Sequence, residues 1–240
     1  MKNIHHPAPI SRRGFLSATT TAGLLWSPSL AGCGSLEIRA DEGEEARSVI
    51  FLVADGMNTG TWTLADYYLQ HRSKQRTEWV QLYQQNAVTR ALMETCSANS
   101  RVTDSAAAAS AWSTGVRIDN GAINFAPDGS ELEPIHRRVQ QSGRSTGLVT
   151  TTRVTHATPA AFAANVKVRG EEDTIARQYL EREVDVLLGG GEKNFSALTR
   201  ADGIDLKQQY QAAGYQLLQS RDQLLNMGEE RAKRLLGLFW

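Results

Sequence analysis

Short runs of apolar, often β-branched residues alternate with helix-compatible stretches, and this alternation constrains the fold most. Such runs fit strands that are buried on both faces, as in parallel sheets. The predicted strands are Ser48–Ala54, Ala87–Met93, Thr146–Thr151, Val184–Leu188 and Leu235–Phe239. The predicted helices are Thr61–His71, Ser105–Ser113, Glu133–Gln141 and Glu171–Glu183.

This order predicts an α/β fold, a three-layer sandwich around a mostly parallel central sheet. Ligands bind at the carboxyl ends of the strands in such sheets. Asp55-Gly56 follows the first predicted strand there as a turn signal. The chain ends inside the apolar run LLGLFW, and an exposed hydrophobic strand would leave unpaired backbone. We therefore expect a sheet that is incomplete at the C-terminus.

The charge balance excludes one class of partner. The 240 residues hold 26 lysines plus arginines and 26 aspartates plus glutamates. Nucleic-acid-binding proteins usually carry a basic surplus or stripe, so no nucleic acid is expected as a partner. A charged substrate must then be held by a local site, because the protein as a whole has no strong field.

Residues 1–33 have the features of an export signal. Arg12-Arg13 followed by Phe15-Leu16 resembles the twin-arginine pattern. The apolar stretch behind it, 15–30, is interrupted by Pro28 and is shorter than the roughly 20 residues of a membrane-spanning helix. Residues 34–47 are polar and acidic and predict a solvated tether. The predicted location is the periplasm or the cell envelope.

Two cysteines are present, and they have different predicted fates. Leu30-Ala31-Gly32-Cys33 resembles a lipobox, in which Cys33 would be acylated and attach the chain to a membrane. The alternative is an ordinary signal peptide that is cleaved near an incidental cysteine. If Cys33 is lipidated, Cys96 remains a free thiol.

An alanine run, 106–109, follows Thr103-Asp104-Ser105 directly. The pattern places a hydroxyl in the first turn of a helix, where free N–H groups and the helix dipole favour anions. A phosphate docked there would meet these N–H groups and the hydroxyl together. The alternative is that one of these three residues only caps the helix.

Several segments resemble the alkaline phosphatase family, in the family's order and at compatible spacings. They are VIFLVADGM (49–57), VTDSAAAASAWSTGVRIDNGAI (102–123), THATPAAFAANVKVRG (155–170), VDVLLGGGEKNF (184–195) and LLGLF (235–239). VTDSAAAASAWSTG is highly specific, whereas DGM and GGG alone would be weak signals. The resemblance makes 48–240 the N-terminal portion of an alkaline-phosphatase-like catalytic domain.

The resemblance implies metal-dependent hydrolysis of phosphate monoesters through a phosphoserine intermediate. Ser105 matches the nucleophile and metal-contacting serine, which the family activates with two zinc ions. Asp55 matches the carboxylate that bridges a zinc and a magnesium ion. Arg169 matches the arginine that grips the phosphate, and Asp104 matches the carboxylate that orients this arginine.

His156 and Thr158 match positions at the family's third, magnesium-type site. Many bacterial members have aspartate where this chain has His156. Imidazole suits zinc or cobalt better than magnesium. The resemblance therefore implies a third site with a weaker magnesium preference, or one in which a water bridges His156 to the ion.

The chain departs from the family at the catalytic zinc ions. The family's zinc histidines lie downstream of the matching region, and none of the five histidines here follows His156. We therefore expect the N-terminal portion of a longer enzyme that is not active by itself. Two alternatives stay open: a membrane-anchored, non-catalytic phosphate- or metal-binding lipoprotein, and a phosphodiesterase or sulfatase-like relative. Family members are commonly homodimers.

Overall fold

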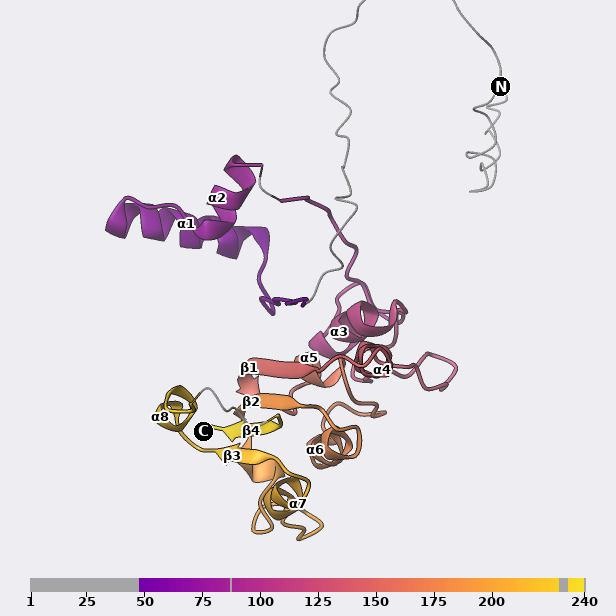
Figure 1. The fold of residues 1–240 in the computed structure, drawn as a ribbon. Coiled ribbons are helices and arrows are strands. Elements are labelled where there is room, and N and C mark those ends of the chain that lie inside the picture. Colours follow the sequence, from indigo (N-terminus) through magenta and orange to yellow (C-terminus); the bar gives the residue numbers. More distant parts are fainter. Residues whose placement is uncertain (1–47, 87, 229–232, 240) are drawn as a thin grey trace, which may run out of the picture. The chain divides into compact units, whose positions relative to one another are not determined.

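The computed structural model describes residues 48–86, 88–228 and 233–239 (Figure 1). The predictions for residues 1–33 and 34–47, including the lipidation of Cys33, lie outside the described residues. Residues 48–51 belong to one compact unit and have neither helix nor strand, and the described residues from Leu52 onward belong to a second. No helix in these described ranges is long and apolar enough to cross a membrane.

The second unit is built on a four-stranded sheet in the order β1-β2-β4-β3, with every neighbouring pair parallel (Figure 1). The strands are β1 Gly147–Arg153, β2 Val186–Gly190, β3 Gln216–Leu218 and β4 Leu235–Leu238. Leu148, Leu187, Leu236 and Leu217 pair in register and share the face that packs into the core. The predicted α/β fold with a parallel sheet is confirmed.

Four helices precede the first strand: α1 Thr59–Ser73, α2 Glu78–Gln84, α3 Ser105–Thr114 and α4 Ile135–Gln141. The helical segments that connect successive strands are α5 Ala157–Ala160, α6 Glu172–Glu181, η1 Glu192–Asn194, α7 Leu206–Ala212 and α8 Arg221–Leu225. The helices predicted within α1, α3, α4 and α6 are confirmed to within a few residues. The short α7 and α8 were not predicted, although Asp205 caps α7 and Ser220 with Gln223 forms a capping box at α8.

Two of the five predicted strands are wrong. Residues 48–54 and 88–93 form no strand, and Leu52 is 80% exposed. An apolar run becomes a strand only where a neighbour pairs its backbone, and neither run has such a neighbour among the described residues. The final predicted run does form a strand, β4, which lies between β2 and β3 and is buried along its length.

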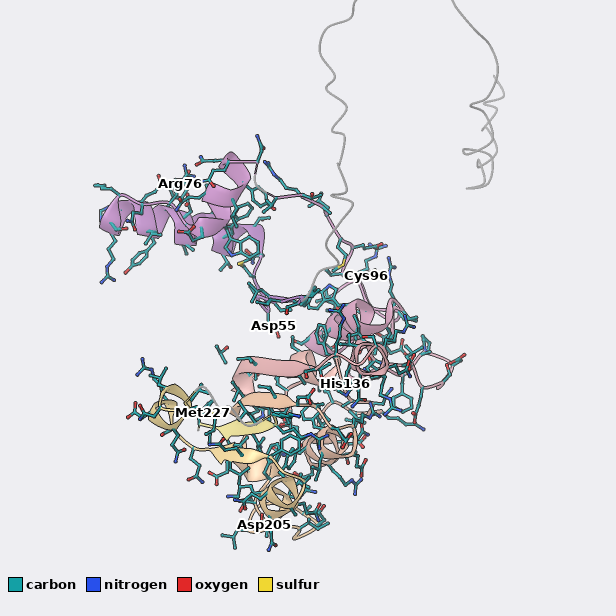
Figure 2. All side chains as sticks on the ribbon, viewed as in Figure 1. Asp55, Arg76, Cys96, His136, Asp205 and Met227 are labelled. Atoms are coloured by element: carbon teal, nitrogen blue, oxygen red, sulfur yellow. The ribbon has the colours of Figure 1, made fainter. Side chains whose placement is uncertain are left out.

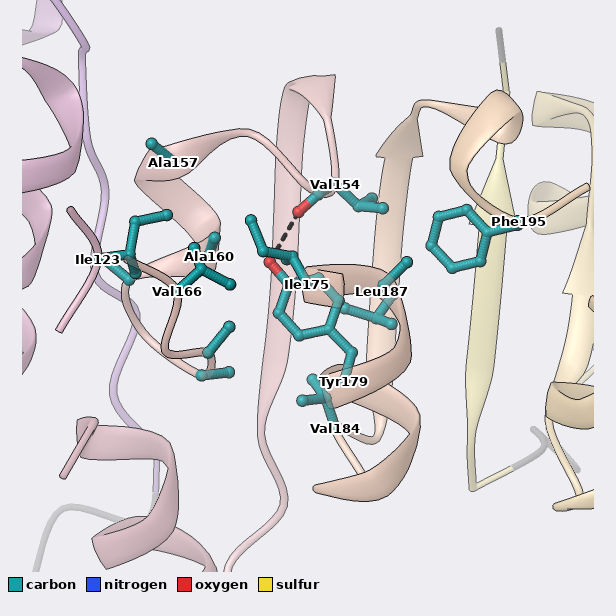
Figure 3. Close-up of a cluster of buried hydrophobic side chains, with 14 of the residues drawn as sticks. Ile123, Val154, Ala157, Ala160, Val166, Ile175, Tyr179, Val184, Leu187 and Phe195 are labelled. Atoms are coloured by element: carbon teal, nitrogen blue, oxygen red, sulfur yellow. Dashed lines mark hydrogen bonds between the residues drawn. The ribbon is translucent and has the colours of Figure 1, made fainter. Parts of the chain in front are cut away.

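Three tyrosines carry polar groups into the core. The hydroxyl of Tyr179 on α6 donates to the Val154 carbonyl at 2.8 Å, among Ile175 and Leu187 (Figure 3). The hydroxyls of Tyr210 and Tyr215 likewise donate to backbone carbonyls, at 2.9 Å each. Because a buried hydroxyl without a partner is costly, these bonds allow large aromatic rings to fill the core.

His136 on α4 is a buried structural histidine. Its Nε2 lies 2.9 Å from the Arg182 carbonyl, and its Nδ1 lies 2.7 Å from the Thr146 hydroxyl. A carbonyl only accepts, so Nε2 carries the proton and Nδ1 accepts from Thr146. The neutral ring thus ties α4 to the end of α6 and to the start of β1.

His136 predicts a loss of stability in mild acid. Burial lowers its pKa, with a further contribution from the charge of Arg182. The unfolded chain then binds a proton more readily than the folded one, so stability is complete above the ordinary histidine pKa and falls as the pH drops toward the folded value. We expect His136→Gln to flatten the dependence of the free energy of unfolding on pH between about 7 and 5, measured by urea denaturation. His71→Gln, at an exposed histidine, is the control and should keep the wild-type slope.

Candidate active site

The Asp55 carboxylate brings together two hydroxyls that are distant in sequence. Asp55 lies in the turn before α1 (Figure 2). Its Oδ2 accepts from the Ser105 hydroxyl at 3.0 Å and from the Thr158 hydroxyl at 2.8 Å. The Ser105 hydroxyl also lies 3.2 Å from Oδ1. Three of the predicted site residues therefore meet at one carboxylate.

Ser105 is the first residue of α3, and Asp104 is its cap. The Oδ1 of Asp104 accepts from the Ala107 N–H at 2.9 Å. Ala106 and Ala109 are fully buried, so the alanine run also lets α3 pack closely into the core. Capping and a free serine hydroxyl coexist here, because Asp104 takes the capping role and leaves Ser105 to face Asp55.

The second oxygen of Asp104 holds Arg169. Asp104 Oδ2 accepts from Arg169 Nη1 at 3.0 Å and from the Gly121 N–H at 3.1 Å. The Arg169 N–H in turn donates to the Gly121 carbonyl at 2.7 Å. One carboxylate thus fixes both the start of α3 and the guanidinium beside it.

Asn120 contributes to this site, and the sequence reasoning did not identify it. Its Oδ1 accepts from the Asp104 N–H at 3.0 Å, and its Nδ2 donates to the Val102 carbonyl at 2.9 Å. The side-chain amide therefore pairs with the segment before Ser105 as a neighbouring strand would. The Asn120-Gly121 dipeptide was the available signal, because it marks a turn, and Gly121 has a φ of 86°.

His156 lies within hydrogen-bonding distance of Arg169, the residue predicted to bind phosphate. It precedes α5, and its Nε2 lies 3.1 Å from Arg169 Nη2. Arginine can only donate, so Nε2 is an acceptor without a proton. Burial and the positive charge of Arg169 lower the pKa of His156. A cation bound directly by Nε2 would have to displace Arg169.

The side chains around Asp55 fit one of the three metal ions that the sequence predicts. The Asp55 carboxylate and the hydroxyls of Ser105 and Thr158 are oxygen donors within hydrogen-bonding distance of one another. Such donors suit a hard divalent cation such as magnesium. No group of three histidine, cysteine, aspartate or glutamate side chains that could hold a metal occurs among the described residues. They do not supply a two-zinc cage.

The other described histidines and the described cysteine have surroundings of their own, and Cys33 lies outside the described residues. His136 is held inside the fold, and His71 is on α1 (Figure 2 labels His136). Cys96 is free and partly buried, and its thiol donates to Glu94 Oε1 at 3.0 Å. None of these three side chains bonds to the residues around Asp55 in the described contacts.

The fold and the site define an α/β protein with a half-buried serine, a carboxylate and an arginine gathered around a helix N-terminus. The model of the family "Alkaline phosphatase" matches residues 46–240, and the chain belongs to this family. Alkaline phosphatase 3 of Bacillus subtilis is 33% identical over 221 residues, which cover 90% of this chain and 46% of that protein.

Solved structures give the same result. The alkaline phosphatase of Thermus thermophilus has a TM-score of 0.69 and 38% identity, covering 74% of this chain and 37% of that one. A histidine-to-aspartate variant of the enzyme from the Antarctic bacterium TAB5, with Mg bound in the M3 site, has a TM-score of 0.60 and 27% identity, covering 73% and 49%. The chain spans about half the length of the curated relatives it matches.

Proposed function

We propose that this site hydrolyses phosphate monoesters through a phosphoserine at Ser105. The observation that carries the proposal is the position of the Ser105 hydroxyl, which begins α3 and bonds to Asp55. Arg169, held by Asp104, lies beside the start of the same helix. The family relationship supports this reaction in preference to other phosphate chemistry.

The chain's own residues would divide the work as follows. Two of the five guanidinium N–H groups of Arg169 donate to Asp104 and His156, which leaves three for phosphate oxygens within the described contacts. The Ser105 oxygen attacks phosphorus, the bond between phosphorus and the alcohol oxygen breaks, and the proton that Ser105 loses ends on the released alcohol. Asp55 accepts the hydrogen bond of the resting Ser105 hydroxyl and so aims its oxygen. Water then releases phosphate from the serine.

The proposed cofactors are two zinc ions and a third ion, magnesium or alternatively zinc or cobalt. Asp55 and Thr158, with His156 nearby, would hold the third ion. The magnesium in the M3 site of the TAB5 variant supports an ion of this kind in the family. A divalent cation supplies positive charge that activates an oxygen nucleophile and neutralises phosphate. The zinc ions need ligands besides those of the described residues.

The test is p-nitrophenol release from p-nitrophenyl phosphate by the purified chain with added zinc and magnesium. We expect weak turnover at most, because the described residues lack a three-ligand metal cluster. Turnover that depends on Ser105 would support the hydrolase. Phosphate binding without any turnover would instead favour the second candidate, a non-catalytic phosphate-binding protein.

We also propose the domain organisation and location that the sequence predicts. Residues 1–33 would direct export by a twin-arginine-type route to the periplasm or envelope, Cys33 would carry the lipid, and 34–47 would tether the domain 48–240. The homodimer common in the family is the proposed assembly. The mass of the mature chain from a membrane fraction tests the first part, since acylated Cys33 would be its first residue.

A further inference from the structure

We propose that Glu172, at the start of α6, is a positioning residue for the site, an inference that rests on the proposed function. Its carboxylate joins two segments that each carry site residues. One is the turn 153–156 with α5, which carries His156 and Thr158. The other is the turn into α6, which carries Arg169.

Glu172 is clamped to the first segment by several bonds. Its carboxylate accepts from Arg153 Nε at 2.8 and 3.1 Å, from Arg153 Nη2 at 2.8 Å, and from the Thr155 hydroxyl at 2.8 Å. The Glu172 side chain is only 14% exposed. Burial would raise the pKa of this carboxyl, yet the bonds from Arg153 and Thr155 hold it below its ordinary value. The clamp is therefore a charged, bidentate pair.

The clamp restricts His156 through the backbone. The His156 N–H donates to the Arg153 carbonyl at 2.9 Å, so the residue held by Glu172 also closes the turn that presents the imidazole. Gly191 lies against the Arg153 stem, where an added Cβ would lie 2.9 Å from Arg153 Cβ. Arg153 thus has little freedom to move without shifting His156.

The backbone of Glu172 restricts the segment that carries Arg169. The Glu172 N–H donates to the Gly170 carbonyl at 2.8 Å, which makes a tight turn directly after Arg169. The guanidinium then reaches His156 at 3.1 Å. Because Glu172 holds both backbone segments, it sets the separation at which His156 and Arg169 meet.

The experiment uses Glu172→Gln in the full 240-residue chain, with Glu181→Gln as the matched control. Glu181 lies on the same helix and pairs only with Arg177 at 3.5 Å in the described contacts, on an exposed surface. Two readouts are needed: inorganic phosphate affinity by calorimetry, and the ¹⁵N shifts of the His156 ring, which report the contact with Arg169 without any ligand.

We expect Glu172→Gln to weaken phosphate binding about 10-fold or more, the size of loss seen when a residue that orients a ligand-binding side chain is removed. We also expect it to shift the His156 ring signals, whereas Glu181→Gln should change neither. In an Arg169→Ala background, Glu172→Gln should have no further effect on phosphate affinity, because the group it positions is gone. A purely structural role would give additive losses. Arg153→Gln removes the partner of Glu172 in the same ion pair, so it should change phosphate affinity and the His156 signals in the same way. It takes the place of Glu172→Gln if that variant folds poorly.

The outcomes separate this inference from the proposed function. If the wild-type chain binds no phosphate, the proposed function is contradicted. If the His156 ring signals nevertheless differ between wild type and Glu172→Gln, the positioning role stands. Unchanged His156 signals, with phosphate affinity within about twofold of wild type, would overturn the positioning role and leave the function standing.

Discussion

Replacing Ser105 with alanine is expected to abolish the weak metal-supported hydrolysis of p-nitrophenyl phosphate, down to the rate of buffer with metal. The physical reason is that the Ser105 hydroxyl is the nucleophile candidate that bonds to Asp55 at the start of α3. Alanine is a good helix former and Asp104 remains as the cap, so the fold should be retained. Intact-mass spectrometry after mixing with substrate should show a phosphorylated wild-type chain and no phosphorylated variant.

The control is Ser130→Ala, at an exposed serine whose hydroxyl bonds to Asp128. It should keep the wild-type rate and the phosphorylated species. If Ser105→Ala retains turnover, or if the phosphate is found on another residue, the nucleophile assignment is wrong.

Replacing Arg169 with alanine is expected to weaken the binding of inorganic phosphate about 10- to 100-fold. Hydrogen bonds to charged groups contribute about 1.5–3 kcal/mol each, and about 1.4 kcal/mol corresponds to a tenfold change in affinity. The Arg169 side chain is 32% exposed, so the lower part of this range applies if water enters the site. Isothermal titration calorimetry with phosphate measures the change directly.

Two further variants sharpen the result for Arg169. Arg169→Lys keeps the charge but loses the planar pair of donors, so its affinity should lie between wild type and Arg169→Ala. Lys167→Ala removes a neighbouring cation, which lies 5.8 Å from the centre of the Phe125 ring, and should have little effect. Equal losses in Lys167→Ala and Arg169→Ala would indicate general charge attraction and would contradict a specific grip.

The sequence predicted those elements whose pattern agrees with their final surroundings. The β2 and β4 runs are apolar and are buried between paired neighbours. Residues 48–54 have the same kind of pattern but form no strand. A strand also needs a neighbouring strand to pair with, and the sequence of an apolar run does not show whether one is present. The short helices α7 and α8 are carried more by their caps than by periodicity, and the caps were overlooked.

The predicted site residues come from the family resemblance, and the structure places them around Asp55 and Arg169. Their supports were not predictable in the same way. Asn120 acts through the backbone of Val102 and Asp104, and Glu172 acts through the turn at Arg153. Both are ordinary polar residues in the sequence, and their roles arise from contacts between segments that only the folded chain brings together.

The buried tyrosines of the core set an upper limit to the pH at which the folded chain is stable. Burial raises the pKa of Tyr215 to about 12 and also raises the pKa values of Tyr179 and Tyr210 well above that of an ordinary tyrosine. The unfolded chain releases its phenolic protons at a pH of about 10. Above that pH, each phenol that the folded chain keeps neutral shifts the equilibrium toward the unfolded chain. Strongly alkaline solutions therefore destabilise the fold through its buried tyrosines. The ultraviolet absorbance of the phenolates would follow this unfolding.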